Sequence, residues 1–275
     1  MRKDLSDFEI EEVKKQAREK LGICRKTNDI IGTQVFSILG LYARVIYYPL
    51  GDDAPWGFTR ISGTQNDAGL DKPFIAINTS IPVPCQVFAA AHELYHIWYE
   101  KNPDILPEDL LDEEGKETNE KKANRFAAGF LIDEMILRQE IETYRIKHFD
   151  IKAVLQLADI FTVPYQALVK RLSETGYIKI DEKERLLAES DDSIAQYRRK
   201  FAIPAGEADN RIAVDNLAEL SVNAHEAGLI TFEKLEYLLD ICGLNPEDLG
   251  IQRVGQSAFP SEEELDSIME GENDN

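Results

Sequence analysis

The residues whose types and spacing could carry chemistry lie in segment 84–100, which reads PCQVFAAAHELYHIWYE. His92, Glu93 and His96 form the pattern HExxH inside a run whose apolar residues recur at helical spacing. Side chains four positions apart lie on one face of a helix, so both imidazoles can point at one metal ion, about 2 Å from each nitrogen. Glu93 would stand beside that ion and could hold the proton of a metal-bound water.

A surface helix could carry two histidines at this spacing by chance, but the surrounding residues favour a metal. An apolar stripe lies beside the two histidines and comprises Val87, Phe88, Ala91 and Tyr95. The histidines therefore face the interior of the protein, where a free imidazolium would be costly and a neutral, metal-bound imidazole would not. The sequence predicts a zinc site on this helix.

The composition limits the class of protein. A chain of 275 residues, 43% of them hydrophobic, can bury a full core and allows one large domain or two modest ones. Residues 1–12 carry charges where a signal peptide has its apolar segment, and no later run approaches the roughly 18 apolar residues of a membrane span. We therefore expect a cytoplasmic protein with no membrane partner. The three cysteines lack a CxxC pair, which argues against a disulfide framework and a cysteine zinc site.

The net charge of −20 disfavours direct binding of nucleic acid. Residues 181–275 hold most of it, with 23 acidic and 8 basic side chains and a net charge of −15. Such a region would attract a basic partner in a salt-dependent way, although a solvated acidic surface explains the same composition.

The apolar pattern predicts two helices, over 5–21 and 29–39, followed by three strands and the histidine helix. The expected strands are 43–50, 56–62 and 73–79, because these segments are rich in β-branched and aromatic residues and turn sequences separate them. A loop over 101–115 then leads to a helix over 117–133, which places Glu120 on an otherwise apolar face.

The remaining chain reads as mainly helical. Residues 150–174 predict two short helices broken at 162–164, and their acidic surroundings disfavour a DNA-binding helix-turn-helix. Further on, we expect a short strand at 177–181, a charged helix over 181–200 and a linker-like break at 202–210. Two helices, 211–227 and 231–242, precede an acidic tail over 261–275 that we expect to be disordered.

Four blocks of the chain together resemble the ImmA/IrrE family of zinc metallopeptidases. They are FIAIN (74–78), AAAHELYHIWY (89–99), NEKKANRFAAGFLI (119–132) and LADIFTVPYQALVKRL (157–172). The resemblance covers about residues 30–175 and departs from the usual pattern at Ile132 and Asp133, where a methionine and a proline are common. It implies an α+β fold, with a small antiparallel or mixed sheet packed on a zincin-type helical core and a mainly helical C-terminal region.

The resemblance also implies roles for individual residues. Members look like gluzincins, so His92, His96 and Glu120 would bind zinc, and Glu93 would act as the general base. Asn124, one turn after Glu120, is similar to the position that orients a histidine ligand. By analogy with the fold, an edge strand at 73–79 would hold an extended substrate. No oxyanion-stabilising residue is identified.

Other acidic residues after His96 are alternative candidates for the third ligand. Glu100 continues the histidine helix, so a ligand there would leave three donors nearly in a line, and residues 108–114 fall in the expected loop. Glu117 lies three residues before Glu120 and could share its face, which makes it the rival candidate.

We expect three parts: a zinc metallopeptidase domain (1–175), a helical regulatory or substrate-recognition region (176–260) and the tail (261–275). The resemblance implies an endopeptidase that cuts a regulatory protein, such as a helix-turn-helix repressor of a mobile element or stress response. The alternative is a non-catalytic, zinc-stabilised interaction module such as a toxin or adaptor. Glu93 favours the enzyme, because a structural zinc site needs no base.

Overall fold

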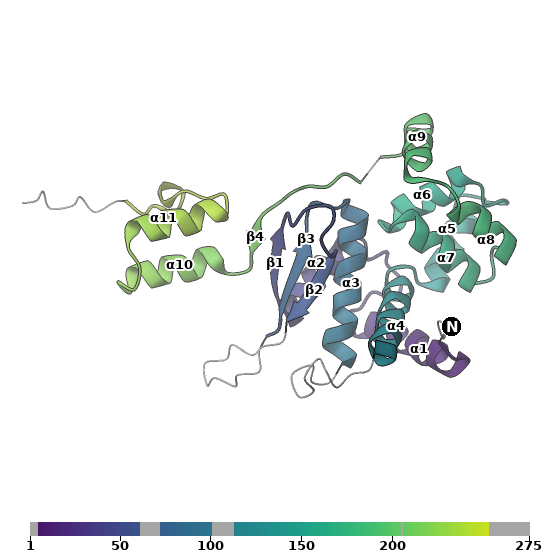
Figure 1. Ribbon diagram of the computed structural model, residues 1–275, viewed down its shortest axis with the longest axis horizontal. Helices are drawn as coiled ribbons and strands as arrows, with labels where there is room; N and C mark the ends of the chain where they lie inside the picture. The colour runs from purple at the N-terminus through teal and green to yellow at the C-terminus, as the bar shows by residue number, and fades with distance from the viewer. Residues whose placement is uncertain (1–4, 61–71, 101–112, 205, 253–275) are drawn as a thin grey trace, which may run out of the picture. The chain divides into compact units, whose positions relative to one another are not determined.

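The computed structural model describes residues 5–60, 72–100, 113–204 and 206–252, and for 113–116 only the backbone. The chain forms two compact units, residues 1–215 and 216–275. The described elements of the first unit are α1 (Asp7–Ile23), α2 (Gln34–Tyr42), β1 (Arg44–Tyr48), β2 (Gly57–Arg60), β3 (Phe74–Asn78), α3 (Val83–Tyr99), α4 (Glu113–Leu131), α5 (Glu134–Thr143), α6 (Ile151–Phe161), α7 (Tyr165–Glu174), α8 (Ile180–Leu187), α9 (Asp191–Phe201) and β4 (Ala213–Val214) (Figure 1).

The sheet has the strand order β2-β3-β1-β4. Strands β1 and β3 are parallel, and β2 and β4 are antiparallel to their neighbours, so the expected α+β fold with a mixed sheet is confirmed. The three expected strands are present with shorter bounds. The interpretation of residues 73–79 as an edge strand is wrong, because β3 pairs with β2 on one side and β1 on the other. Among the described strands, β2 forms the edge next to α3.

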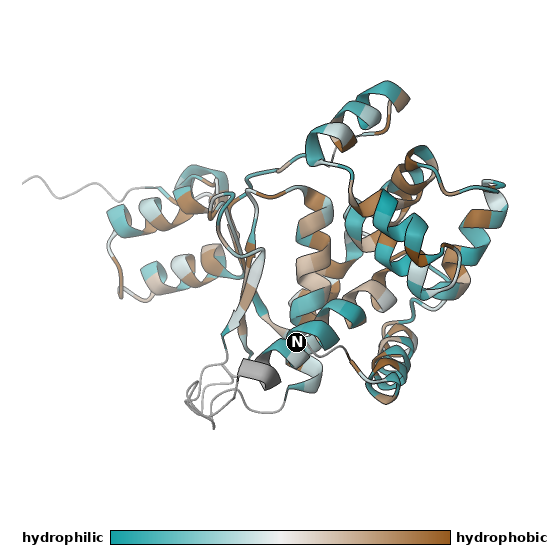
Figure 2. Cartoon of the chain, turned by 45° about the vertical axis from the view of Figure 1, so that its right-hand side comes forward, coloured by the Kyte–Doolittle hydropathy of each residue, from teal (hydrophilic) through white to brown (hydrophobic). Residues whose placement is uncertain are grey.

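Helix α3 is buried between the sheet and α4. It contacts β2 and β3 on one side and packs along α4, which in turn packs against α1. Figure 2 shows apolar residues over much of α3, as expected for a helix covered on several sides. An aromatic cluster joins α3 to α4, with ring centroids 5.5–5.8 Å apart, and contains Tyr95, Trp98, Tyr99, Phe126 and Phe130. This cluster fixes where α4 lies beside the two histidines.

Helix α5 was not predicted, and it explains the unusual residues at the end of α4. Asp133 is the N-cap of α5, where its side chain accepts hydrogen bonds from the backbone N–H groups of Met135 and Ile136. The chain therefore ends one helix and starts another at the position where the resembling family often has a proline. The two helices α6 and α7 are confirmed, and Thr162 between them has a positive φ of 53°.

The segment 177–200 differs from the expectation in two ways. Residues 177–179 form no strand, and Ile180 begins α8 instead. The single charged helix expected over 181–200 is two helices, because α8 ends at Leu187 and Ser190 caps α9 by accepting a hydrogen bond from the N–H of Ser193. Both helices bury apolar residues in the first unit's core, Leu186 from α8 and Ile194 from α9, and Ile178 just before α8 is buried there too.

The linker-like break continues into an anchored segment, residues 206–215, which we call the strap. Its backbone bonds to the β3–α3 region, from Asn210 N–H to Thr79 O (3.1 Å) and from Val83 N–H to Glu207 O (3.3 Å). Thr79 Oγ1 also donates to Arg211 O (2.8 Å). The strap then forms β4 on the edge of β1. The helix expected over 211–227 is therefore wrong at its start, since the helix begins at Leu217.

The second unit is described over residues 216–252 and contains a helical hairpin followed by a short 3-10 helix. Its elements are α10 (Leu217–Glu226), α11 (Phe232–Ile241) and η1 (Pro246–Leu249). Leu235 and Leu239 of α11 are fully buried. The tail expected over 261–275 lies outside the described residues. None of the described helices is long and apolar enough to cross a membrane.

We predict that a chain ending at Asp215 folds cooperatively and that a chain ending at Ser173 does not. The shorter chain loses β4 and the buried side chains of Ile178, Leu186 and Ile194. Each such side chain stabilises the fold by about 1.5–3 kcal/mol, against a total of about 5–15 kcal/mol. Urea unfolding followed by circular dichroism measures both chains. Equal midpoints and slopes for the two chains would contradict a structural role for residues 174–215.

Candidate metal centre

The helices α3 and α4 bring His92, His96 and Glu120 together. His92 Nε2 lies 3.1 Å from Glu120 Oε2, and His96 Nε2 lies 3.7 Å from Glu120 Oε1. The two Nε2 atoms are 3.0 Å apart. Both imidazoles are largely buried, whereas the Glu120 side chain is 58% exposed and approaches them from the open side of the site.

The other nitrogen of each imidazole is held by a polar side chain. His92 Nδ1 lies 3.1 Å from Asn124 Oδ1, and His96 Nδ1 lies 2.9 Å from Glu100 Oε1. Since both oxygens are acceptors, each Nδ1 carries the proton and donates it, and each Nε2 presents a lone pair. Asn124 thus lies where the resemblance placed it. From the sequence alone, Glu100 is a candidate only as a metal ligand, whereas the structure places it where it orients His96. The spacing of four residues on one helix is the sequence feature that indicates this contact.

The resulting arrangement fits a metal ion. Two nitrogen lone pairs and a carboxylate converge on one point, which is unfavourable unless a cation lies between them. Two atoms bound tetrahedrally to one zinc ion at about 2.0–2.1 Å lie about 3.3 Å apart, close to the distances found here. Among the described residues, this is the group of histidine and acidic side chains whose geometry suits a metal ion. Two histidines, one glutamate and an open position are the donor set of catalytic zinc sites.

The charged neighbours shift the pKa values of these groups in the expected directions. The contact with the His92 ring is the largest effect on Glu120 and lowers its pKa below the ordinary value, against the opposing effect of burial, so the carboxylate stays ionised. Burial is the largest single effect on His96 and disfavours its charged form. The hydrogen bond to Glu100 and the negative charges of Glu100, Glu93 and Glu120 together outweigh burial and raise the pKa of His96. The site therefore attracts positive charge, whether a proton or a metal ion.

Glu93 lies between α3 and strand β2, with only 5% of its surface exposed. Thr59 Oγ1 donates a 2.6 Å hydrogen bond to Glu93 Oε2. A Cβ at Gly57 would come within 3.2 Å of both Glu93 Oε1 and Ala76 O, so glycine leaves room for the carboxylate. Burial raises the pKa of Glu93, and the hydrogen bond from Thr59 opposes this effect. Nothing in the sequence pointed to Thr59, because its contact depends on strand placement.

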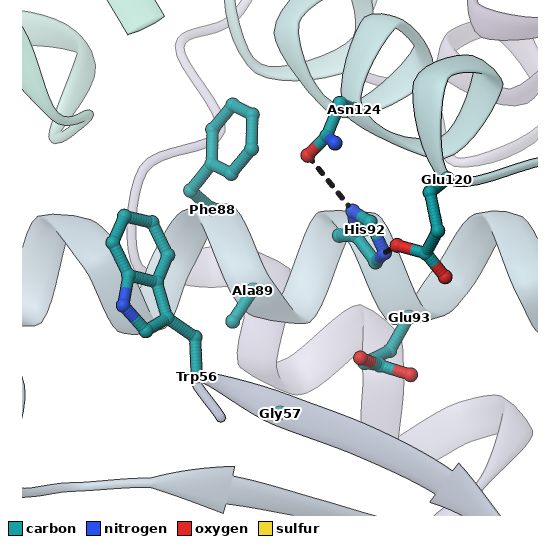
Figure 3. Close-up of a pocket in the computed structure, with 8 residues that line it drawn as sticks. All are labelled: Trp56, Gly57, Phe88, Ala89, His92, Glu93, Glu120 and Asn124. Atoms are coloured by element: carbon teal, nitrogen blue, oxygen red, sulfur yellow. Dashed lines mark hydrogen bonds and ion pairs between the residues drawn. The ribbon is translucent and has the colours of Figure 1, made fainter. Parts of the chain in front are cut away.

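A cavity of about 240 Å³ opens beside these residues. Its lining comes from β2, α3 and α4 and consists of Trp56, Gly57, Phe88, Ala89, His92, Glu93, Glu120 and Asn124 (Figure 3). Glu93, His92 and Glu120 border the same space, so a molecule in the cavity would contact the Glu93 carboxylate and two of the candidate metal ligands together.

The rival ligand Glu117 lies outside this cluster. Its side chain is exposed and forms an ion pair with Lys121 over 3.0 Å. The loop carboxylates at 108 and 112 fall outside the described residues, as do the side chains at 113 and 114. Within the described part of the chain, the geometry therefore favours Glu120 over Glu117.

Comparison with known proteins agrees with this geometry. Residues 43–173 match the family model of the IrrE N-terminal-like domain, a peptidase family. This part of the chain belongs to the IrrE N-terminal-like domain family. The matched segment contains every strand and helix that forms the site, from β1 to α4. The resemblance to ImmA/IrrE proteins is thus confirmed.

Further likeness outside the family model is weak. A transcriptional regulator from Mycobacterium tuberculosis matches with 15% sequence identity and a TM-score of 0.41. The match covers 59% of this chain, and the chain spans about half (47%) of the regulator's length. No curated protein matches the sequence significantly.

We predict that Glu120→Gln weakens zinc binding by at least about a hundredfold, because loss of even an orienting neighbour costs up to about that factor. Glu117→Gln is the matched control and should change the affinity little, since Glu117 pairs with Lys121 away from the cluster. Competition with a zinc chelator and metal analysis of purified protein measure both. The reverse ranking would show that Glu117 is the ligand.

Proposed function

We propose that this chain is a zinc-dependent endopeptidase. The observation that carries the proposal is the position of Glu93, a buried carboxylate that lines the same cavity as His92 and Glu120, two members of the candidate metal cluster. The peptidase family of residues 43–173 supports the same reaction class. In this proposal His92, His96 and Glu120 bind zinc, which when bound acts as a Lewis acid and makes water more acidic.

The chain's own residues supply the proton transfers. Thr59 holds Glu93 Oε2, so the carboxylate keeps one orientation and Oε1 is left to accept a proton from the attacking water. Glu93 then returns that proton to the departing amine of the cleaved peptide bond. Asn124 and Glu100 keep the two histidine rings oriented through the Nδ1 atoms during both steps.

The substrate we propose is a regulatory protein in the cytoplasm, such as a helix-turn-helix repressor of a mobile element or a stress response. The family resemblance supports this choice. We further propose that the acidic region 176–260 recognises it, because a DNA-binding repressor is basic and the net charge of residues 181–275 is −15. The strong negative charge also disfavours direct contact with nucleic acid or an anionic membrane. A chain ending at Asp215 lacks residues 216–275. Weaker salt dependence of its cleavage would support recognition by residues 216–260, and unchanged dependence would reject recognition by that part of the region.

The alternative function is a non-catalytic interaction module, such as a toxin or adaptor, that keeps zinc for stability. Structural zinc sites close all four positions with protein ligands. Here the cluster offers three protein ligands and opens onto a cavity, and Glu93 is buried at a cost that a purely structural site does not require. These features favour the enzyme.

We predict that Glu93→Gln retains one zinc per chain and loses cleavage about a hundredfold to ten-thousandfold, the usual effect of removing a positioned base. Metal analysis gives the zinc content. Proteomic comparison of cells carrying the wild type and the Glu93→Gln protein identifies the substrate, and cleavage of that substrate gives the rate.

Two variants of Thr59 serve as matched controls. Thr59→Val removes the hydrogen bond to Glu93 and should lower kcat with KM and zinc content unchanged, whereas Thr59→Ser keeps a hydroxyl and should retain most of the rate.

Full activity of Glu93→Gln on the identified substrate would exclude the proposed mechanism.

A further inference from the structure

We propose that the end of the cavity formed by Trp56 and Phe88 is a subsite for one bulky apolar side chain of the substrate, next to the bond that is cut. This inference rests on the proposed function and specifies which polypeptides the site accepts. Figure 3 shows the two rings together at one end of the cavity, with His92 and Glu120 towards the other end.

The backbone fixes both aromatic residues relative to the candidate catalytic groups. Phe88 lies four residues before His92 on α3, so its ring stands one turn along the same helix face. Trp56 immediately precedes β2, and its carbonyl accepts a 3.0 Å hydrogen bond from Asn78 N–H on β3. The two rings therefore come from the two elements that also hold Glu93, which places the subsite beside the reacting bond.

The size of the cavity suits a side chain better than a whole small-molecule ligand. Its volume of about 240 Å³ is below the roughly 300–1,000 Å³ of pockets for drug-sized ligands. Ala89 lines the wall between Phe88 and His92 and, being small, leaves this space open. A larger side chain at position 89 would reduce it.

The chemistry of the lining selects an apolar occupant. Trp56, Gly57, Phe88 and Ala89 bring no charged group to this end, whereas Glu93, Glu120, His92 and Asn124 line the remainder. A charged substrate side chain would lose its hydration there without gaining a partner among these four residues. Trp56 is 44% exposed. An apolar or aromatic substrate side chain would cover its ring and remove it from water, which is favourable.

Exposure alone would not support this conclusion, and Phe58 provides the comparison. Phe58 is 49% exposed and lies on the same strand. Gly57 and Thr59 on either side of it contact Glu93, but Phe58 is not one of the residues that line the cavity. Phe58 is therefore a matched control: an exposed aromatic residue of the same strand that does not line the cavity.

The test uses the full-length, zinc-loaded protein and a peptide library of defined sequences prepared from a cell extract. Mass spectrometry identifies the cleaved peptides, and the residues on both sides of each cleaved bond are counted. The wild type is expected to favour Phe, Leu, Met, Tyr or Trp at one position next to the bond. Trp56→Ala and Phe88→Leu are expected to lower kcat/KM for those peptides by about tenfold or more relative to peptides with Ala there, while Phe58→Ala keeps the wild-type preference.

Zinc content and thermal unfolding establish that each variant is folded, and Trp56 is exposed enough for its truncation to be tolerated. Ala89→Val is an independent variant, which should shift the preference towards smaller side chains by narrowing the subsite. Cleavage by the wild type without a preference, or an unchanged preference in both Trp56→Ala and Phe88→Leu, would overturn the subsite and leave the peptidase intact. No cleavage of any peptide by the zinc-loaded wild type would overturn the proposed function itself.

Discussion

The meeting of three hydrogen-bond acceptors between α3 and α4 is the constraint on which the rest of the site depends. His92, His96 and Glu120 lie within a few ångströms of one another. Each imidazole donates its Nδ1 proton to Asn124 or Glu100, so no ring proton is left between the three acceptors. Repulsion among these acceptors must be offset by packing elsewhere or by a cation between them. The aromatic cluster around Phe126 provides the packing, because it holds the two helices together directly beside the acceptors.

Strand β2 completes the site from the other side. Thr59 orients the carboxylate of Glu93, Gly57 leaves space for it, and Trp56 borders the cavity. One short edge strand and the residue before it thus contribute a hydrogen bond to Glu93, the space beside its carboxylate and one ring of the proposed side-chain subsite. Since β2 pairs with β3 on one side only, its other edge remains available among the described strands for an extended polypeptide. The edge strand beside α3 is therefore β2, in place of the expected residues 73–79.

The strap connects the site to sequence beyond the matched family domain. Residues 206–215 bond to Thr79 and Val83, at the turn from β3 into α3, and add β4 to the sheet. Arg211 of the strap also lies over the ring of Tyr47 at 4.1 Å. The start of the histidine helix is therefore supported by residues more than a hundred positions later in the chain. The functional division of the chain at residue 175 remains a proposal, while the first compact unit extends to Asp215.

The sequence by itself determined the parts of the site that depend on one helix. The spacing of His92 and His96 places both rings on one face whatever surrounds them, and the three strands and the α6–α7 pair followed from local patterns. The resemblance supplied Glu120 and Asn124. Only the tertiary structure decided that β2 is the edge strand, that Thr59 and Trp56 reach the cavity, and that the strap is anchored. Strand order and contacts between distant segments arise from packing of the whole chain, and periodicity within one segment carries no information about them.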